Sequence, residues 1–140
     1  MTAFYQNPLF KTWFFSLLLL ALLHIVAIEL FLYWLYPWFD IVTHFLGGVT
    51  VSLGVFWFLF ESPFVRIEKR PLVIIGTLTL AIVGIGVAWE VFEFLTGVTR
   101  GEENFVADTT LDLIMDAFGA LCGGWYAARI SHKNHDKSYE

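Results

Sequence analysis

Four long apolar blocks dominate this chain of 140 residues, and each is long enough to cross a lipid bilayer. They cover about residues 13–36, 41–60, 72–95 and 110–130. A helix needs roughly 20 apolar residues to cross the ~30 Å hydrocarbon core, and it satisfies its own backbone hydrogen bonds there. With 58% hydrophobic and 15% charged residues, the chain has too little polar surface for a soluble domain. The sequence therefore predicts an all-α membrane protein with four transmembrane helices in a single domain, residues 1–130.

The first block is expected to remain as a helix rather than to be cleaved as a signal peptide. It is longer than a signal core, contains His24 and Glu29, and leads into another apolar block. After the fourth block, residues 131–140 are polar and predict a flexible cytoplasmic tail.

Basic residues are distributed unevenly among the predicted loops. Seven basic residues lie on one side of the membrane: Lys11, Arg66, Lys69, Arg70, Arg129, Lys133 and Lys137. The connections on the other side contain only Arg100. The positive-inside rule therefore predicts a multi-pass protein of the plasma (inner) membrane, with both termini and the 61–71 loop in the cytoplasm. The net charge of −5 comes mostly from acids near the blocks, so it does not indicate a nucleic-acid partner.

Two parts of the sequence are near-copies of each other. The pattern A-x-E-[LV]-F occurs at 27–31 and 88–92, and D-[IL]-[VI]-x-[HD]-x-x-G-[GA] occurs at 40–48 and 112–120. The copies predict two hairpin repeats, about 13–60 and 72–130. Because both hairpins would run out and back in the same order, we expect parallel repeats about a pseudo-twofold axis along the membrane normal.

Ionisable side chains lie within or at the outer ends of the blocks, where lipid makes them costly. With the predicted orientation, eight of these side chains lie in the outer leaflet: Glu29, Asp40, His44, Glu90, Glu93, Asp108, Asp112 and Asp116. Spacing of four residues places Asp40 with His44, and Asp112 with Asp116, on one helix face. Small residues follow, where helix backbones could approach closely: Gly47, Gly48, Gly119, Ala120, Gly123 and Gly124. The pattern predicts a ring of carboxylates with one imidazole, open to the outside or periplasm.

No lysine or arginine lies near these acids within the blocks, since Arg129 is at the cytoplasmic end of the fourth block. Either the acids are partly protonated, or a cation binds among them. Oxygen ligands with a single imidazole suit Mg²⁺ or Mn²⁺, and Zn²⁺ or Fe²⁺ could bind through His44. We therefore expect all eight residues to contribute to a divalent metal site, with Glu93 as the candidate general base.

A structural interpretation competes with this one for some of the residues. Asp40 and Asp108 could be solvated residues at helix ends, and Asp108 and Asp112 could cap the fourth helix. Glu29, His44, Glu90 and Asp116 lie deeper and favour a functional cluster. His24 is deeper still and is expected to be a hydrogen-bonded packing residue rather than a ligand. The remaining histidines, His132 and His135, fall in the predicted tail.

Three motifs in order resemble a known group of proteins. They are Phe39-Asp40-x3-His44-Phe45-Leu46-Gly47-Gly48, Trp89-Glu90-x2-Glu93, and Asp108-x3-Asp112-x3-Asp116 with Gly119-Ala120. Over roughly residues 35–125 the chain resembles the VanZ-like and YjdF-like small bacterial inner-membrane proteins. The resemblance implies that the acids and histidine of these motifs form the site, and the VanZ-like group is associated with glycopeptide-antibiotic tolerance. At residues 109–111 this chain has Thr-Thr-Leu where YjdF-like proteins tend to be tryptophan-rich.

Three classes of function fit these patterns. A metal-dependent hydrolase could act on a lipid-like substrate, a phosphorylated or acylated amphiphile at the outer leaflet. A proton- or cation-coupled transporter or channel would need a polar path to the cytoplasm, for which the sequence offers only His24 and a few small or hydroxyl residues. This shortage disfavours transport by a monomer and leaves a path at an oligomer interface as the alternative. A non-catalytic membrane module could use the metal for stability. In each case the lipid bilayer is the partner, and the glycine-rich faces could also support a homo-oligomer.

Overall fold

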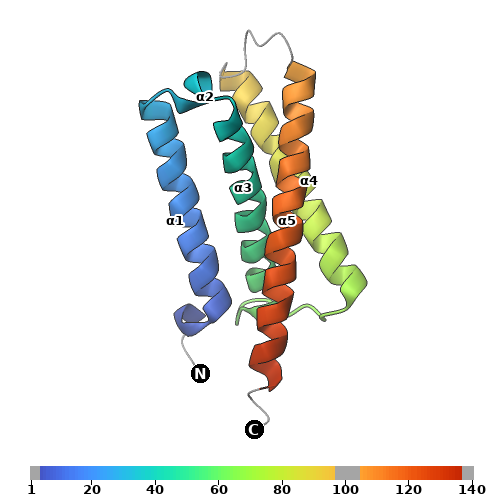
Figure 1. Ribbon diagram of the computed structural model, residues 1–140. Helices are drawn as coiled ribbons and strands as arrows, with labels where there is room; N and C mark the ends of the chain where they lie inside the picture. The colour runs from blue at the N-terminus through green and yellow to red at the C-terminus, as the bar shows by residue number, and fades with distance from the viewer. Residues whose placement is uncertain (1–3, 97–104, 137–140) are drawn as a thin grey trace.

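The computed structural model describes residues 4–96 and 105–136, and these ranges contain helices and no strands. A short 3-10 turn, Phe4–Gln6, precedes α1 (Pro8–Glu29), α2 (Leu32–Leu35) and α3 (Trp38–Phe56). A π-helical turn, Trp57–Glu61, continues α3 and is followed by α4 (Pro71–Thr96) and α5 (Phe105–Asp136). In Figure 1, α1 and α4 run in one direction, and α3 and α5 run in the other. We call the end where α1 begins and α5 finishes the terminal end, and the opposite one the α2 end.

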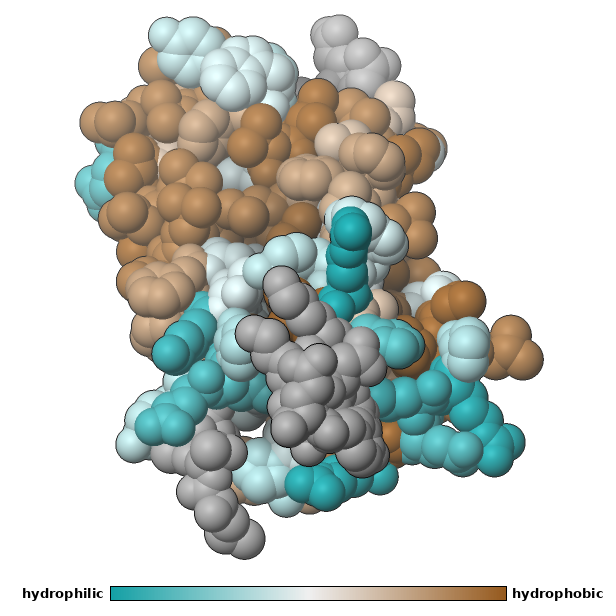
Figure 2. All heavy atoms as spheres, turned by 60° about the horizontal axis from the view of Figure 1, so that its bottom comes forward, coloured by the Kyte–Doolittle hydropathy of each residue, from teal (hydrophilic) through white to brown (hydrophobic). Residues whose placement is uncertain are grey.

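Three helices in the described ranges are long and apolar enough to cross a membrane. They are α1, α3 together with its π-helical turn (Trp38–Glu61), and α4. The fourth long helix, α5, has 32 residues but is less apolar than the other three. Figure 2 shows hydrophobic helix flanks and a hydrophilic surface that gathers at the terminal end. The chain is therefore a helical membrane protein whose described residues include three candidate spans, where the sequence predicted four.

The first apolar block is not one continuous helix, in contrast to the prediction for residues 13–36. α1 ends at Glu29, and Phe31 adopts the left-handed conformation with φ 55°. A residue in this conformation cannot continue a right-handed helix. The chain then makes the single turn of α2 before Pro37 leads into α3.

The other helix boundaries lie close to the predicted ones or extend beyond them. At the start of α1, the Asn7 side chain accepts a hydrogen bond of 2.8 Å from the Leu9 N–H, and Pro8 occupies the first turn. α5 continues to Asp136, so it includes the beginning of the segment that was expected to be a tail. Arg100 and Lys137, which the orientation argument used, lie outside the described residues.

The most extensive helix contact joins α3 and α5, which lie side by side (Figure 1). A Cβ atom on Gly48 would overlap the backbone carbonyl of Asp116, and one on Gly119 would overlap that of Phe45. A Cβ atom on Gly123 would overlap the Ser52 hydroxyl. Side chains at these positions would push the two helices apart, so the predicted close approach through glycine is confirmed, and this face of both helices is used inside the molecule.

A hydrophobic core lies toward the terminal end. Its buried members are Leu9, Leu53, Phe56, Trp57, Phe60 and Ala127. Trp13 stacks on Trp57 with ring centroids 5.6 Å apart and an interplanar angle of 10°. The loop after α3 is held at the same end, because Lys69 Nζ lies 2.6 Å from Glu61 Oε1 and 2.9 Å from Ser131 Oγ. Packing thus fixes the helices at the end opposite to the acids that were predicted as metal ligands.

Candidate metal centre

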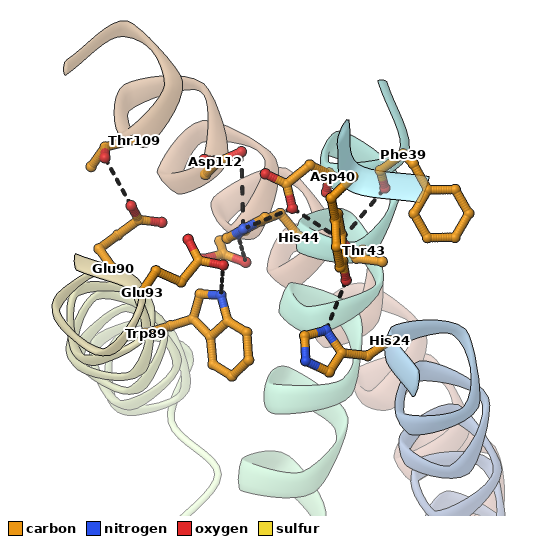
Figure 3. Close-up of polar contacts among 12 residues, drawn as sticks. His24, Phe39, Asp40, Thr43, His44, Trp89, Glu90, Glu93, Thr109 and Asp112 are labelled. Atoms are coloured by element: carbon orange, nitrogen blue, oxygen red, sulfur yellow. Dashed lines mark hydrogen bonds and ion pairs between the residues drawn. The ribbon is translucent and has the colours of Figure 1, made fainter. Parts of the chain in front are cut away.

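An acid–histidine cluster lies toward the α2 end, between α3, α4 and α5 (Figure 3). Its six members are Asp40, His44, Glu90, Glu93, Asp112 and Asp116. The glycine contact between α3 and α5 begins within a turn or so of His44 and Asp116, so it brings their helix faces together. Glu90 and Glu93 share a face of α4 at a spacing of three residues.

One imidazole stands among three carboxylates. Nε2 of His44 lies 3.6 Å from Asp40 Oδ1 and 4.0 Å from Asp112 Oδ1. Nδ1 of the same ring lies 3.5 Å from Asp116 Oδ1. His44, Asp112 and Asp116 are all buried. The imidazole of α3 therefore contacts two carboxylates of α5.

The two glutamates of α4 approach the imidazole from another side. Oε2 of Glu90 accepts a hydrogen bond of 2.8 Å from the Thr109 hydroxyl. Glu90 is only 7% exposed, and its Oε1 is buried. This oxygen has no hydrogen-bond partner among the described residues. Oε1 of Glu93 accepts a hydrogen bond of 3.0 Å from the Trp89 indole. A buried carboxylate oxygen without a hydrogen-bond partner is costly.

Two sets of ligand atoms share His44. Asp40, His44 and Asp112 each offer one atom within 4.8 Å of the others, and His44, Glu90 and Glu93 form a second such set. Ligands at about 2.0–2.6 Å from one ion are at most about 4–5 Å apart, so either set has room for a cation at its centre. Carboxylates with one imidazole suit Mg²⁺, Mn²⁺, Zn²⁺ or Fe²⁺.

Basic side chains do not balance this cluster within the described ranges. There, the lysine and arginine ion pairs are those of Lys69 with Glu61 and of Arg70 with Glu68. Both pairs belong to the loop at the terminal end. Among the residues that the structure describes, His44 alone forms ion pairs with the acids of the cluster, so most of their negative charge needs protons or a cation.

Three of the eight predicted ligands lie outside both sets, namely Glu29, Asp108 and Asp116. Glu29 is exposed at the last residue of α1, where the break at Phe31 ends the helix. Asp108 is half-buried in the first turn of α5, and its position agrees with the alternative interpretation of an acid near a helix N-terminus. Asp116 is the third, and it belongs to the cluster because its Oδ1 lies 3.5 Å from Nδ1 of His44.

A cavity of about 330 Å³ extends from the cluster between α1, α3 and α4. One end is polar and is lined by His24, Tyr33, Asp40, Thr43, His44, Trp89, Glu93 and Asp116. Most of the remaining wall is apolar and is formed by Leu17, Leu20, Ala21, Val51, Ile82 and Ile85, with Gly47, Gly86 and Thr50. The cavity thus joins a polar head region to a hydrophobic body.

A comparison with known protein families identifies the family of this chain. Residues 1–133 match the model of a family described as predicted membrane protein (DUF2238). The chain belongs to the DUF2238 family. This match confirms a small membrane protein, while assignment to the VanZ-like or YjdF-like groups stays a prediction. Searches of curated protein sequences and of solved structures give no match.

Sequence reasoning about this DUF2238 member missed two polar partners of the glutamates. Thr109 lies three residues before Asp112 on the same face of α5, and Trp89 lies four residues before Glu93. These helical spacings were the available signals. His24 is a hydrogen-bonded packing residue, as predicted, because its Nδ1 lies 2.7 Å from the Tyr33 hydroxyl. Its ring also meets Trp89 edge to face at 5.4 Å, which connects α1 to α4.

Proposed function

We propose that this protein binds a divalent cation at the acid–histidine cluster and uses it to hydrolyse a lipid-like substrate within the membrane. The buried, unpartnered Oε1 of Glu90 beside two ligand sets around His44 carries this proposal. Each uncompensated buried charge costs several kcal/mol, about the size of a whole domain's stability when summed over the cluster. A bound cation would remove this cost and would give Glu90 Oε1 its partner.

The proposal includes four spans arranged as two parallel hairpins, with the cluster in the outer leaflet. The common direction of α1 with α4, and of α3 with α5, supports this arrangement (Figure 1). Lys11, Arg66, Lys69 and Arg70 are exposed at or near the terminal end, which supports placing that end in the cytoplasm.

Within this function Glu93 is the candidate general base. Its carboxylate lines the cavity, whereas Glu90 and Asp112 do not, so Glu93 is the glutamate that a substrate in the cavity could reach. The Trp89 indole holds its Oε1. Glu93 would take a proton from a water molecule whose oxygen attacks the ester carbon or the phosphorus, and would return it to the leaving oxygen as the ester bond breaks. The cation would polarise the attacked group.

The apolar lining of the cavity argues against a transport path. Away from the cluster its walls include Leu17, Val51 and Ile82, with Thr50 as the one hydroxyl in that part of the lining. A proton or cation would find no series of polar groups there to replace water. A non-catalytic module stabilised by metal is the remaining alternative, and it differs from the hydrolase only in activity.

Elemental mass spectrometry of the detergent-purified protein tests the cation site. The parent and Glu29→Gln, whose side chain is exposed outside the cluster, should bind near-stoichiometric metal. His44→Ala and Glu90→Gln should lose it. A parent protein that is folded by circular dichroism and binds no added Mg²⁺, Mn²⁺, Zn²⁺ or Fe²⁺ would refute the proposal.

A second variant separates an enzyme from a metal-stabilised module. Glu93→Gln should lower hydrolysis of outer-leaflet lipid esters by about 10²–10⁴-fold, the usual contribution of a general base, while part of the metal affinity remains. If the parent binds metal and hydrolyses none of these lipids, the module replaces the hydrolase.

A further inference from the structure

The length of the cavity matches one leaflet of a bilayer. On α3 its lining runs from Asp40 to Val51, and on α4 from Ile82 to Glu93. At 1.5 Å per residue, each of these stretches is about 16 Å long. This is about half of the ~30 Å hydrocarbon core. The polar end coincides with the cluster, so the cavity has the dimensions and polarity of a single lipid chain below its head group.

The cavity is also open along its side. Leu17 of α1 is 41% exposed and Ile85 of α4 is 49% exposed, although both line the cavity. α1 and α4 are both candidate spans, so the gap between these residues faces lipid. At the polar end His24 and Trp89 meet, and Figure 3 shows both rings directed into the space between α1 and α4. A chain could therefore enter sideways below this aromatic contact.

We propose that the cavity binds one acyl chain of a membrane lipid and presents the ester or phosphate of its head group to His44 and Glu93. This inference rests on the proposed function and names its substrate class. The volume of about 330 Å³ lies at the small end of the ~300–1,000 Å³ typical of ligand sites, which suits one chain rather than two. A second chain of the same lipid would remain in the bilayer through the side opening.

The wall chemistry excludes a polar occupant along most of the cavity. Leucine, isoleucine and valine side chains offer no hydrogen bonds, and an apolar cavity binds apolar ligands in preference to water. The apolar wall would therefore select the length of the acyl chain, and the cluster would bind the head group.

Native mass spectrometry with single-chain phosphatidylglycerols of increasing acyl length tests the inference. The parent should bind one molecule, and binding should stop increasing once the chain exceeds the cavity. Ala21→Trp should fill the cavity and weaken binding by about tenfold or more. Ala88→Trp is the matched control, because Ala88 is exposed on α4 and does not line the cavity. Equal binding by these two variants, or no saturable one-to-one complex with the parent, would overturn the inference.

Two further measurements keep the result interpretable. Val51→Phe narrows the far end of the cavity and should shift the preferred chain to a shorter length, which a merely misfolded variant would not do. Glu90→Gln tests the metal separately. If this variant or a metal-free parent still binds one chain, the cavity inference stands even if the cation proposal fails. If the parent binds metal and no chain, only the cavity inference fails.

Discussion

The hydroxyl of Thr109 donates a hydrogen bond of 2.8 Å to Oε2 of Glu90, and so joins the first turns of α5 to α4. This contact fixes the direction of the glutamate and leaves its other oxygen for the cluster. Partners of this kind orient metal ligands, and they contribute to affinity without touching the ion.

Thr109→Val should therefore weaken metal binding by about 10–100-fold, because Glu90 loses its orienting donor. Metal titration of the purified protein measures the change. Thr110→Val is the matched control, since the Thr110 hydroxyl is exposed and bonds to Val106 O within its own helix. Equal affinities for the two variants would show that Thr109 does not orient Glu90.

Gly48→Ala should destabilise the protein by about 1–3 kcal/mol, because the added methyl group would overlap the Asp116 carbonyl and separate α3 from α5. Gly84→Ala introduces the same group into open space and should be neutral or stabilising by up to about 1 kcal/mol through helix propensity. Reversible unfolding in detergent micelles, followed by circular dichroism, compares them. A Gly48→Ala protein as stable as the parent would contradict the close contact.

Lys69→Met should cost about 1–2 kcal/mol of unfolding free energy. The substitution removes the cationic partner of the largely buried Glu61 carboxylate, which keeps its hydrogen bond from Ser131. Because Lys69 is partly exposed, the loss of stability is limited. Arg70→Met breaks a pair with Glu68 in which both side chains are 68% exposed, so it should cost no more than about 0.5 kcal/mol. The same unfolding assay distinguishes these values, and equal losses would show that the Glu61 pair has no special role.

The hydrogen bond between His24 and Tyr33 should appear as a coupling energy of about 0.5–1.5 kcal/mol in a double-mutant cycle. The cycle combines His24→Phe with Tyr33→Phe and uses unfolding free energies. Tyr36→Phe changes an exposed tyrosine beyond α2 and, paired with His24→Phe, should give additive effects. Additive effects of His24→Phe and Tyr33→Phe would mean that this hydrogen bond does not hold α2 against α1.

The sequence was informative where helical periodicity and residue size decide the structure. Apolar length predicted the membrane class, and the glycines after His44 and Asp116 predicted the close contact of α3 with α5. Spacing of four residues predicted that Asp40 and His44 share one helix face, and their side chains meet there. These features depend on a few neighbouring residues, which is why they could be read directly.

Other features depend on the rotation of one helix against another or on a single backbone conformation. No local pattern marks Phe31 for a positive φ, so the break that leaves Glu29 outside the cluster could not be predicted. The near-copy of its motif at Glu90 suggested equivalent roles, yet only Glu90 meets His44. The partnership of Thr109 with Glu90 likewise requires the actual contact of α4 with α5.

The glycine contact and the cluster occupy the same faces of α3 and α5, with Gly48 one turn after His44 and Gly119 close behind Asp116. One residue inserted between His44 and Gly48 would turn His44 by about 100° relative to the contact, away from Asp112 and Asp116. Substitutions can change either feature, but insertions and deletions in this short segment change both. The segment should therefore keep a constant length in any descendant that retains the site.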